Sequence, residues 1–300
     1  MGQLEDMAMF VRIVDAGGIT KAADQLDLAK SAVSRRLSDL ETRLNSQLIS
    51  RTTRKSTLTQ AGEAYYQRAR NILDEVNSLN EETSGTKACI EGTLRITAPL
   101  SFGLMHLSEL IHDYATEHDK LSFQLDFSDR RLDLVEEGYE LAIRIGELPD
   151  SSLQAKRLTQ IRHVLCASPD YLAQHGTPKD LAQLKQHSIL QYGLGKQSKF
   201  DLIDGEGKKH SIFFSSKMQA NNGDFLLKMA IKGHGITYLP SFLAYQALEQ
   251  GLLTPILCQY QLHTAYAYAV YPKNRFLSQR CRYLIDFIAE RLGDEPYWDE

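Results

Sequence analysis

The sequence predicts an N-terminal all-α winged helix-turn-helix with a linker helix, followed by a C-terminal α/β effector domain of two lobes. Three observations support this fold class. Residues 1–59 contain three helical patterns and then a basic, β-branched run, residues 60–84 contain a heptad-like apolar pattern, and residues 91–300 alternate strand-like and helix-like segments. A chain of 300 residues is long enough for two or three such units.

Composition narrows the class of protein. Hydrophobic residues make up 43% and charged residues 24%, which is typical of a globular protein with a sizeable core. Apolar runs fall short of the ~18 residues that span a bilayer. The acidic start at Glu5 and Asp6 lacks the features of a secretory signal. We therefore expect a cytoplasmic protein without membrane contact.

The four cysteines are widely scattered. They form no CxxC pair and no Cys/His cluster at metal-binding spacing. We expect reduced thiols and no metal site, while a redox-sensing pair stays open as the alternative.

A basic patch lies within a net acidic chain. Residues 28–60 carry seven Lys and Arg side chains against two Asp and Glu, although the whole chain has a net charge of −4. Such a local excess of positive charge is typical of a polyanion site. Solvated basic faces are also common, so the patch needs support from the local structure.

The first two helices are short and amphipathic. The first is predicted from apolar residues at spacings of three and four between Leu4 and Val14, and Gly17 and Gly18 end it. We expect Thr20 to cap a second helix over residues 21–26.

The third helix, from about Lys30 to Leu44, presents two contrasting faces. Its apolar stripe consists of Val33, Leu37, Leu40 and Leu44. The opposite face carries Ser31, Arg35, Ser38 and Thr42, with Ser34 and Arg36 on the flanks. A helix fits the major groove of B-DNA, where Arg35 can pair with guanine and the serines can bind bases or phosphates. A solvated polar face is the other interpretation of this helix taken alone.

The following segment favours the DNA-binding interpretation. Residues 51–59 are polar and rich in β-branched types, and they predict a short β-hairpin with Arg51, Arg54 and Lys55 placed for phosphates. Three helices followed by a basic hairpin form a winged helix-turn-helix.

These residues resemble the N-terminal domain of LysR-type transcriptional regulators. The matching motifs are FVRIV at 10–14, GGITKAA at 17–23, AVSRRL at 32–37, LE at 40–41, LISRTTR at 48–54 and LTQAG at 58–62. The resemblance implies that part of the third helix faces the operator groove and that the wing grips the DNA backbone. The implied groove residues are Ser31, Ala32, Ser34 and Arg35, the implied backbone residues are Arg51, Thr53 and Arg54, and Lys30 and Arg36 complete the predicted DNA-binding set.

Two positions depart from the family pattern. Ala29 stands where the family usually has a Ser or Thr cap, which costs about 1 kcal/mol at the start of the helix. Asn45 replaces the usual glycine after Leu44, and we expect the turn to survive because Asn tolerates the left-handed conformation.

A long linker helix is predicted from Gln60 to about Ser84, capped by Thr59. Its apolar seam follows alternating gaps of four and three through Tyr65, Ala69, Ile72, Val76, Leu79 and Thr83. At 1.5 Å per residue the helix spans about 37 Å, close to one turn of DNA. A homodimer joined through this seam can place two recognition helices on two half-sites. A helix packed on its own chain is the alternative, and residues 85–88 are the predicted hinge.

The C-terminal residues predict an α/β domain that crosses between two lobes. The expected strands are 93–97, 121–127, 141–145, 164–167 and 265–271, and the expected helices are 102–117, 133–137 and 278–291. Ligands of such folds bind at the carboxyl ends of strands, near helix N-termini.

The resemblance extends over this region and is greatest to the CrgA-like branch of the family. The motifs are GTLRI at 92–96, DLVEEG at 133–138, LAIRIG at 141–146, ASPDYL at 167–172 and GITYLP at 235–240. It implies a domain similar to periplasmic binding proteins, with a small ligand between the lobes. The expected divisions are 1–59 for DNA binding, 60–90 for linker and hinge, and 91–300 for effector binding, with lobe I at about 91–161 and 266–300 and lobe II at about 162–265.

Candidate effector residues follow from the matching positions. They are Ser101, Phe102, Arg144, Gly146, Asn222, Gly223 and Tyr268, each of which has packing or a turn as its alternative role. Two helix N-termini and Arg144 would suit a small carboxylate. The C-terminal tail from Asp294 onward extends past the usual end of the family, and we expect it to be flexible.

The leading hypothesis is a sequence-specific DNA-binding transcription regulator controlled by a small effector. We expect a homodimer or homotetramer that binds and bends promoter DNA and contacts RNA polymerase, without a cofactor. A solute-binding module without regulatory DNA binding is the alternative. The sequence holds no GxSxG, P-loop, HExxH or strand-linked GxGxxG motif, so we expect no enzyme. The effector, the operator, the target genes and the choice between activation and repression are not predicted.

Overall fold

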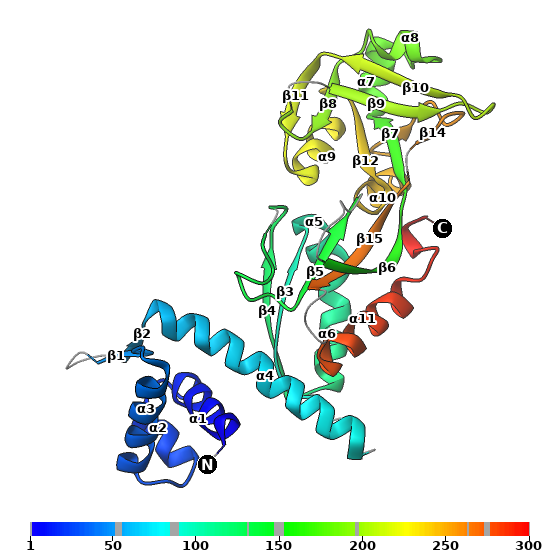
Figure 1. Cartoon of the computed structure of the whole chain (residues 1–300). Coiled ribbons are helices and arrows are strands. Elements are labelled where there is room, and N and C mark those ends of the chain that lie inside the picture. The colour runs from blue at the N-terminus through cyan, green and yellow to red at the C-terminus, as the bar shows by residue number, and fades with distance from the viewer. Residues whose placement is uncertain are drawn as a thin grey trace. The chain divides into compact units, whose positions relative to one another are not determined.

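The computed structural model separates the chain into two compact units, Met1–Cys89 and Ile90–Glu300. The two units are described separately, and Figure 1 labels their elements. The structure describes residues 2–51, 56–84, 90–130, 132–146, 153–195, 198–262, 264–272 and 277–299.

The first unit is a three-helix bundle with a short hairpin and a long helix. Its elements are α1 (Gln3–Asp15), α2 (Ile19–Gln25), α3 (Lys30–Leu44), β1 (Ile49–Arg51), β2 (Ser56–Leu58) and α4 (Gln60–Ser84). Strands β1 and β2 pair antiparallel, with Ile49 opposite Leu58. Leu37 and Leu40 of α3 are fully buried in one core, as their helical spacing predicts, and Phe10 of α1 is buried with them. The predicted apolar stripes do not hold at their ends, because Leu4 is 41% exposed and Leu44 is 36% exposed.

The turn between α1 and α2 corrects one prediction. Gly17 and Gly18 take φ values of +73° and +148°, a backbone that only glycine adopts readily. Because this turn is so tight, α2 begins at Ile19 with Gly18 in the capping position. Thr20 therefore lies inside the helix and does not cap it. The two departures around α3 behave as predicted: Ala29 gives no side-chain cap, and Asn45 is left-handed at φ 49°.

Polar side chains hold the hairpin to the bundle. Glu41 Oε1 accepts hydrogen bonds from the backbone N–H groups of Leu48 at 2.8 Å and Ile49 at 3.0 Å. Thr59 Oγ1 accepts from the Gly62 N–H at 2.9 Å, which confirms the predicted cap of α4. Gly62 leaves the room that this junction needs, because a Cβ there would lie 1.9 Å from the Leu48 carbonyl oxygen.

Lobe I of the second unit is built on a five-stranded sheet of order β4-β3-β5-β15-β6. Its strands are β3 (Gly92–Ala98), β4 (Leu121–Phe127), β5 (Leu141–Ile145), β6 (Leu153–Ile161) and β15 (Ala265–Pro272). Its helices are α5 (Leu100–Phe102), η1 (Gly103–Leu107), α6 (Ser108–Glu117) and α11 (Gln279–Leu292). Strand β3 runs parallel to β4 and β5, whereas β15 runs antiparallel to both of its neighbours.

Lobe II contains a second five-stranded sheet, of order β11-β8-β12-β7-β13, and a three-stranded sheet, β10-β9-β14. Its strands are β7 (His163–Ala167), β8 (Ile189–Tyr192), β9 (Ser198–Ile203), β10 (Lys209–Phe214), β11 (Ser216–Ala220), β12 (Ile236–Pro240), β13 (Thr254–Pro255) and β14 (Gln261–Leu262). Its helices are α7 (Pro169–His175), α8 (Leu181–Leu184), α9 (Gly223–Ile231) and α10 (Ser241–Glu249). The chain passes from lobe I to lobe II after β6 and returns in β15, so two segments connect the lobes (Figure 1).

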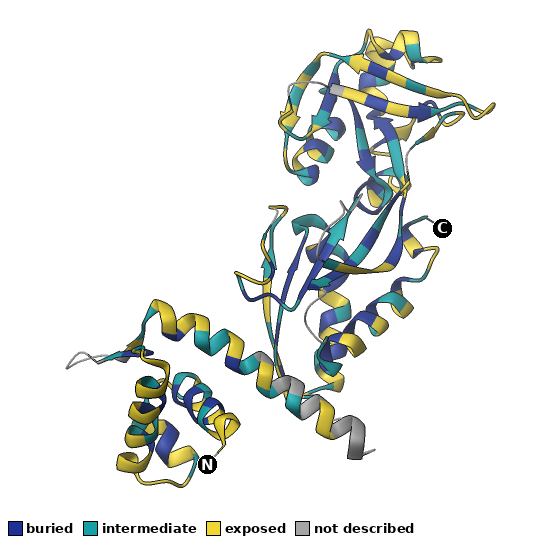
Figure 2. Ribbon diagram, viewed as in Figure 1, coloured by how far each residue is buried: buried dark blue, intermediate teal, exposed yellow. Residues whose placement is uncertain are grey.

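One hydrophobic core runs through both lobes. It joins lobe I residues such as Leu94 and Ile143 to lobe II residues such as Leu226 and Leu239, all at most 1% exposed. Figure 2 shows this burial along the strands of both sheets, while the outer faces of the helices are exposed. The alternation of strands and helices that the sequence predicts therefore forms one continuous core in this unit.

Two helices differ from their predicted form. The helix expected from Phe102 begins at Leu100 and passes through the π-helical segment η1 before α6. The helix expected over residues 133–137 is a hydrogen-bonded turn. The Asp133 carboxylate accepts from the N–H groups of Val135 and Glu136 at 2.9 and 3.1 Å, which stabilises this turn in place of a helix.

The C-terminal tail is packed, which corrects the expectation of flexibility. Its last turn, η2 (Tyr297–Asp299), contacts α10, and the Trp298 side chain is 4% exposed. Trp298 lies 4.3 Å from the His106 ring, measured between ring centroids, and packs edge to face on Phe102. Burial of this large apolar side chain outweighs the entropy of a free tail.

His106 joins three segments through its two ring nitrogens. Its Nε2 lies 3.2 Å from the Phe242 carbonyl oxygen, which can only accept a hydrogen bond. Nε2 therefore carries the proton, and Nδ1 accepts from the Tyr297 hydroxyl at 2.7 Å. Burial lowers the pKa of His106 to about 4, although the hydrogen bond to Phe242 opposes this shift.

We predict that Glu41→Ala loosens the start of the hairpin. Loss of a charged acceptor shared by two backbone N–H groups should raise the amide exchange rates of Leu48 and Ile49 by about tenfold or more. Hydrogen exchange on the full-length chain measures this rate. Asp39→Ala, an exposed carboxylate on the same helix, is the matched control. Equal protection of both amides in the Glu41 variant would contradict the prediction.

We also predict a pH-dependent stability that originates at His106. The unfolded state takes up a proton near pH 6.5, whereas the folded state does so only near pH 4. Stability should therefore fall as the pH drops from about 6.5 to about 4, by on the order of 1 kcal/mol per pH unit. Urea unfolding across this range should show a smaller slope in His106→Gln. The exposed His112→Gln should keep the wild-type slope, and equal slopes in all three proteins would refute the assignment.

Candidate functional site

Helix α3 separates an apolar face from a polar one. Val33, Leu37 and Leu40 are completely buried against the bundle. Of the predicted DNA-binding residues on this helix, Lys30, Ser31, Ala32 and Arg35 are exposed, and Ser34 and Arg36 are half-buried. The start of the helix therefore exposes Ser31 and Arg35, with the half-buried Ser34 beside them.

The wing residues are described only in part. The backbone of Arg51 ends strand β1, but its side chain lies outside the described residues. Thr53 and Arg54 also lie outside the described residues. The pairing of β1 with β2 confirms a hairpin in this region, although its first strand begins at Ile49, two residues before the predicted start.

The apolar seam of α4 is only partly covered within the first unit. Ala69 is buried, and Tyr65 packs edge to face on Phe10 of α1, with ring centroids 5.4 Å apart. Farther along, Ile72 is 39% exposed and Leu79 is 64% exposed. The seam thus changes from a bundle contact at its start to an exposed apolar row.

A cavity of about 280 Å³ lies between lobe I and lobe II. It is lined by Pro99, Ser101, Phe102, Asp129, Ile145, Gly146, His163, Tyr192, Gly223, Tyr238, Leu239, Pro240, Phe242, Leu243 and Ala265. The lining comes from the carboxyl ends of strands and from the starts of α5 and α9, which is where ligands bind in open α/β sheets.

Four of the seven predicted effector residues line this cavity: Ser101, Phe102, Gly146 and Gly223. The other three do not contribute to its described lining. Asn222 caps α9 by accepting from the Phe225 N–H at 2.9 Å. Arg144 donates to the Ile143 carbonyl at 2.8 Å and to Thr97 Oγ1 at 3.4 Å. Tyr268 packs in a cluster with Tyr139 and Val270.

The sequence analysis missed the groups that give the cavity most of its chemical character. These are Asp129 and the rings of His163, Tyr192, Tyr238 and Phe242. Asp129 follows the end of the predicted strand 121–127, so the rule that ligands bind at strand ends could have identified it. The four rings come from separate segments of lobe II, and no local pattern connects them.

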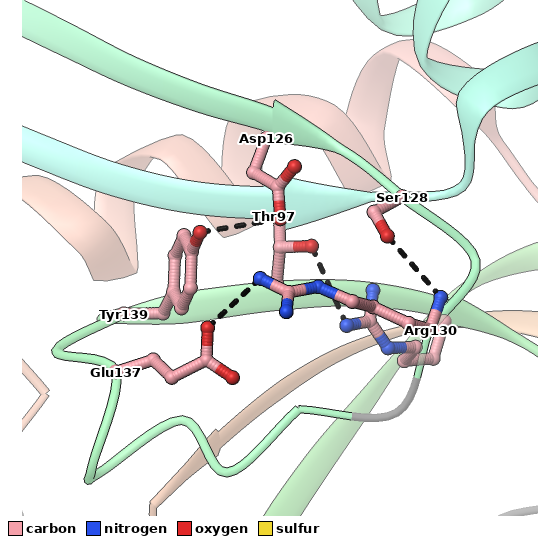
Figure 3. Close-up of polar contacts among 7 residues, drawn as sticks. Thr97, Asp126, Ser128, Arg130, Glu137 and Tyr139 are labelled. Atoms are coloured by element: carbon pink, nitrogen blue, oxygen red, sulfur yellow. Dashed lines mark hydrogen bonds and ion pairs between the residues drawn. The ribbon is translucent and has the colours of Figure 1, made fainter.

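Lobe I holds the segment that carries Asp129 with a network of polar contacts, shown in Figure 3. Arg130 pairs with Glu137 at 3.0 Å, and its backbone N–H donates to Ser128 Oγ at 3.3 Å. The Tyr139 hydroxyl donates to Asp126 at 3.2 Å. These contacts tie the segment after β4 to the turn before β5.

Two carboxylates lie in or beside the cavity: Asp129 is part of its lining, and Asp224 follows the lining residue Gly223. Burial raises the pKa of Asp129 and nearby Asp224 adds to the rise, whereas Arg144 and a hydrogen bond from the Leu100 N–H lower it. Asp224, in the first turn of α9, accepts a hydrogen bond from the Ser101 hydroxyl across the lobes. Burial also raises the pKa of Tyr192, and Asp129 adds to that shift.

Among the described residues, no group of three or more His, Cys, Asp or Glu side chains is placed to hold a metal ion. No helix in the described part of the chain has the length and apolarity to cross a membrane.

The chain matches two family descriptions over almost its whole length. Residues 4–63 match the bacterial regulatory helix-turn-helix protein of the lysR family, and residues 89–293 match the LysR substrate binding domain. It is 32% identical to the transcriptional regulator CrgA of Neisseria meningitidis over 97% of both chains. It is also 32% identical to the transcriptional activator AaeR of Escherichia coli, covering 97% of this chain and 94% of AaeR.

Solved structures show the same architecture. The structure of CrgA from Neisseria meningitidis is similar with a TM-score of 0.62 and 32% identity, covering 97% of this chain and 99% of CrgA. The full-length Vibrio cholerae virulence activator AphB is similar with a TM-score of 0.60 and 27% identity, covering 96% and 99%. The chain therefore belongs to the LysR family of DNA-binding transcription regulators, which join a helix-turn-helix domain to a two-lobed effector-binding domain.

Proposed function

We propose that α3 reads the operator and that the wing contacts the DNA backbone. The observation that carries this proposal is the exposed start of α3, where Ser31 and Arg35 lie opposite the buried stripe. Arg35 is the proposed base reader, because a guanidinium can donate two hydrogen bonds to guanine. The remaining proposed contacts, to bases or phosphates, are Lys30, Ala32, Ser34, Arg36, Arg51, Thr53 and Arg54.

The exposed end of the α4 seam supports a homodimer within this proposal. Ile72 and Leu79 are large apolar side chains left in solvent on a helix of 25 residues. Pairing two such seams buries these side chains and sets two copies of α3 on neighbouring half-sites. A tetramer formed from two dimers would bend the DNA between paired sites.

The cavity between the lobes is the proposed effector site. A bound molecule that contacts both lobes favours one arrangement of them over another, and the change passes to DNA bending or to RNA polymerase in the cytoplasm. The proposal assigns no catalytic step to this chain. The sequence favoured a small carboxylate as effector, and that class stays a prediction.

We predict that the purified protein binds its own upstream intergenic DNA with sequence specificity. Mobility shifts should show weaker binding for both Arg35→Ala and Arg51→Ala. Arg35→Ala should also relax the base preference at one operator position, by about 1–3 kcal/mol. Arg51→Ala should weaken binding to all sequences alike and reduce its salt dependence.

Arg68→Ala, on α4 outside the proposed DNA surface, is the control for loss of one positive charge, and it should bind as the wild type does. Binding by the wild type that shows no sequence preference at low salt, with or without small molecules, would contradict the proposal.

A further inference from the structure

We propose that the effector of this protein carries a positively charged ammonium group on a small apolar body. This inference rests on the proposed role of the cavity as effector site and names the chemical class that it takes. Three features of the cavity support it: the carboxylates in and beside the lining, the contacts of Arg144 and the aromatic walls.

The N-termini of α5 and α9 could attract an anion, but each already lies beside a carboxylate side chain of the protein itself. The Leu100 N–H, at the start of α5, donates to the Asp129 carboxylate. Asp224 lies in the first turn of α9, and the Ser101 hydroxyl donates to it. An effector carboxylate in the cavity would therefore meet two like charges in the places where helix dipoles favour an anion.

Arg144 does not place a positively charged group in the cavity lining for an effector carboxylate. Its guanidinium is directed to the Ile143 carbonyl and to Thr97 Oγ1, and the residue is absent from the described lining. The positive charge of Arg144 offsets part of the negative charge of Asp129. Among Arg144, Asp129 and Asp224 there is no second positive charge to offset that of Asp224. The balance of charge near the cavity is therefore negative.

The walls of the cavity suit a cation with an apolar body. Phe102 and Phe242 pack edge to face with ring centroids 5.3 Å apart. His163 and Tyr238 stack at 4.7 Å on the same cavity. The negative faces of aromatic rings attract ammonium groups, and the attraction grows where water is excluded. A volume of about 280 Å³ limits the effector to a small molecule.

Asp129 is the expected partner of the ammonium group. It lines the cavity and is exposed, so that an effector can reach it. The neighbouring carboxylate of Asp224 makes its negative charge more costly. An ammonium placed between the two carboxylates relieves this repulsion and links a lobe I residue to a lobe II residue. Binding would therefore favour the arrangement of the lobes that brings Asp224 close to an effector held by Asp129.

Calorimetry with matched probe pairs tests this inference on the full-length protein. The pairs are 2-phenylethylammonium with 3-phenylpropionate, benzylammonium with phenylacetate, and butylammonium with pentanoate. Each pair has the same apolar body and opposite charge. We expect at least one ammonium compound to bind about tenfold or more tightly than its carboxylate partner. A panel in which no ammonium compound exceeds its partner, including one in which nothing binds, would overturn the inference.

Variants assign the preference to the two carboxylates. Asp129→Asn and Asp224→Asn should each reduce the affinity for the ammonium probe about tenfold while leaving the affinity for neutral 2-phenylethanol nearly unchanged. Because two substitutions are made, a folding defect in one variant leaves the other to test the inference. Thermal melting shows whether each variant is folded. Asp119→Asn, an exposed carboxylate outside the cavity, is the matched control and should behave as the wild type. An ammonium preference that survives in both cavity variants would also overturn the inference.

The mobility shift separates this inference from the proposed function. Specific DNA binding together with a carboxylate preference would overturn the effector class and leave the regulator intact. An ammonium preference without specific DNA binding would support the effector class and contradict the proposed contacts of α3.

Discussion

The contact between Phe102 and Phe242 is the point on which the second unit depends. Phe102 is the last residue of α5 in lobe I, Phe242 lies in the first turn of α10 in lobe II, and their rings meet edge to face at 5.3 Å. Both rings also line the cavity, and Trp298 packs edge to face on Phe102 and 6.2 Å from Phe242. One aromatic cluster thus holds the C-terminal tail, joins the lobes and shapes the cavity proposed as the effector site. Any movement of the lobes has to shift rings that are at most 4% exposed, which makes intermediate arrangements unfavourable.

The charged groups near this cluster have structural roles as well as the proposed chemical one. Asp129 accepts at the start of α5, and Asp224 holds Ser101 across the lobes. These contacts stabilise the walls of the cavity at the cost of placing two carboxylates near each other. A site of this kind is already organised before a ligand enters, so binding energy can go into choosing between lobe arrangements.

Local sequence pattern predicted the structure correctly where the spacing of residues within one segment determines that structure. The spacing of Val33, Leu37 and Leu40 predicted the buried face of α3, and the cap at Thr59 predicted the start of α4. The pattern failed where a short-range signal competed with another contact. The paired glycines moved the start of α2 away from Thr20, and the carboxylate of Asp133 stabilised a turn in place of a helix. In both cases a few hydrogen bonds or one backbone conformation outweighed a weak helix propensity.

The sequence by itself determined the polar face of α3, because that face depends on spacing within one helix. It also determined the family, the order of the domains and four residues of the cavity lining, because motifs along the chain match those of the family. Only the tertiary structure decided that Asp129 lines the cavity, that Asp224 bonds to Ser101 of its lining, that the rings of lobe II form its walls, and that Trp298 packs beside His106. These groups are brought together by the two crossings between the lobes. Contacts across such distances in sequence arise from the packing of whole sheets and helices, which no local periodicity encodes.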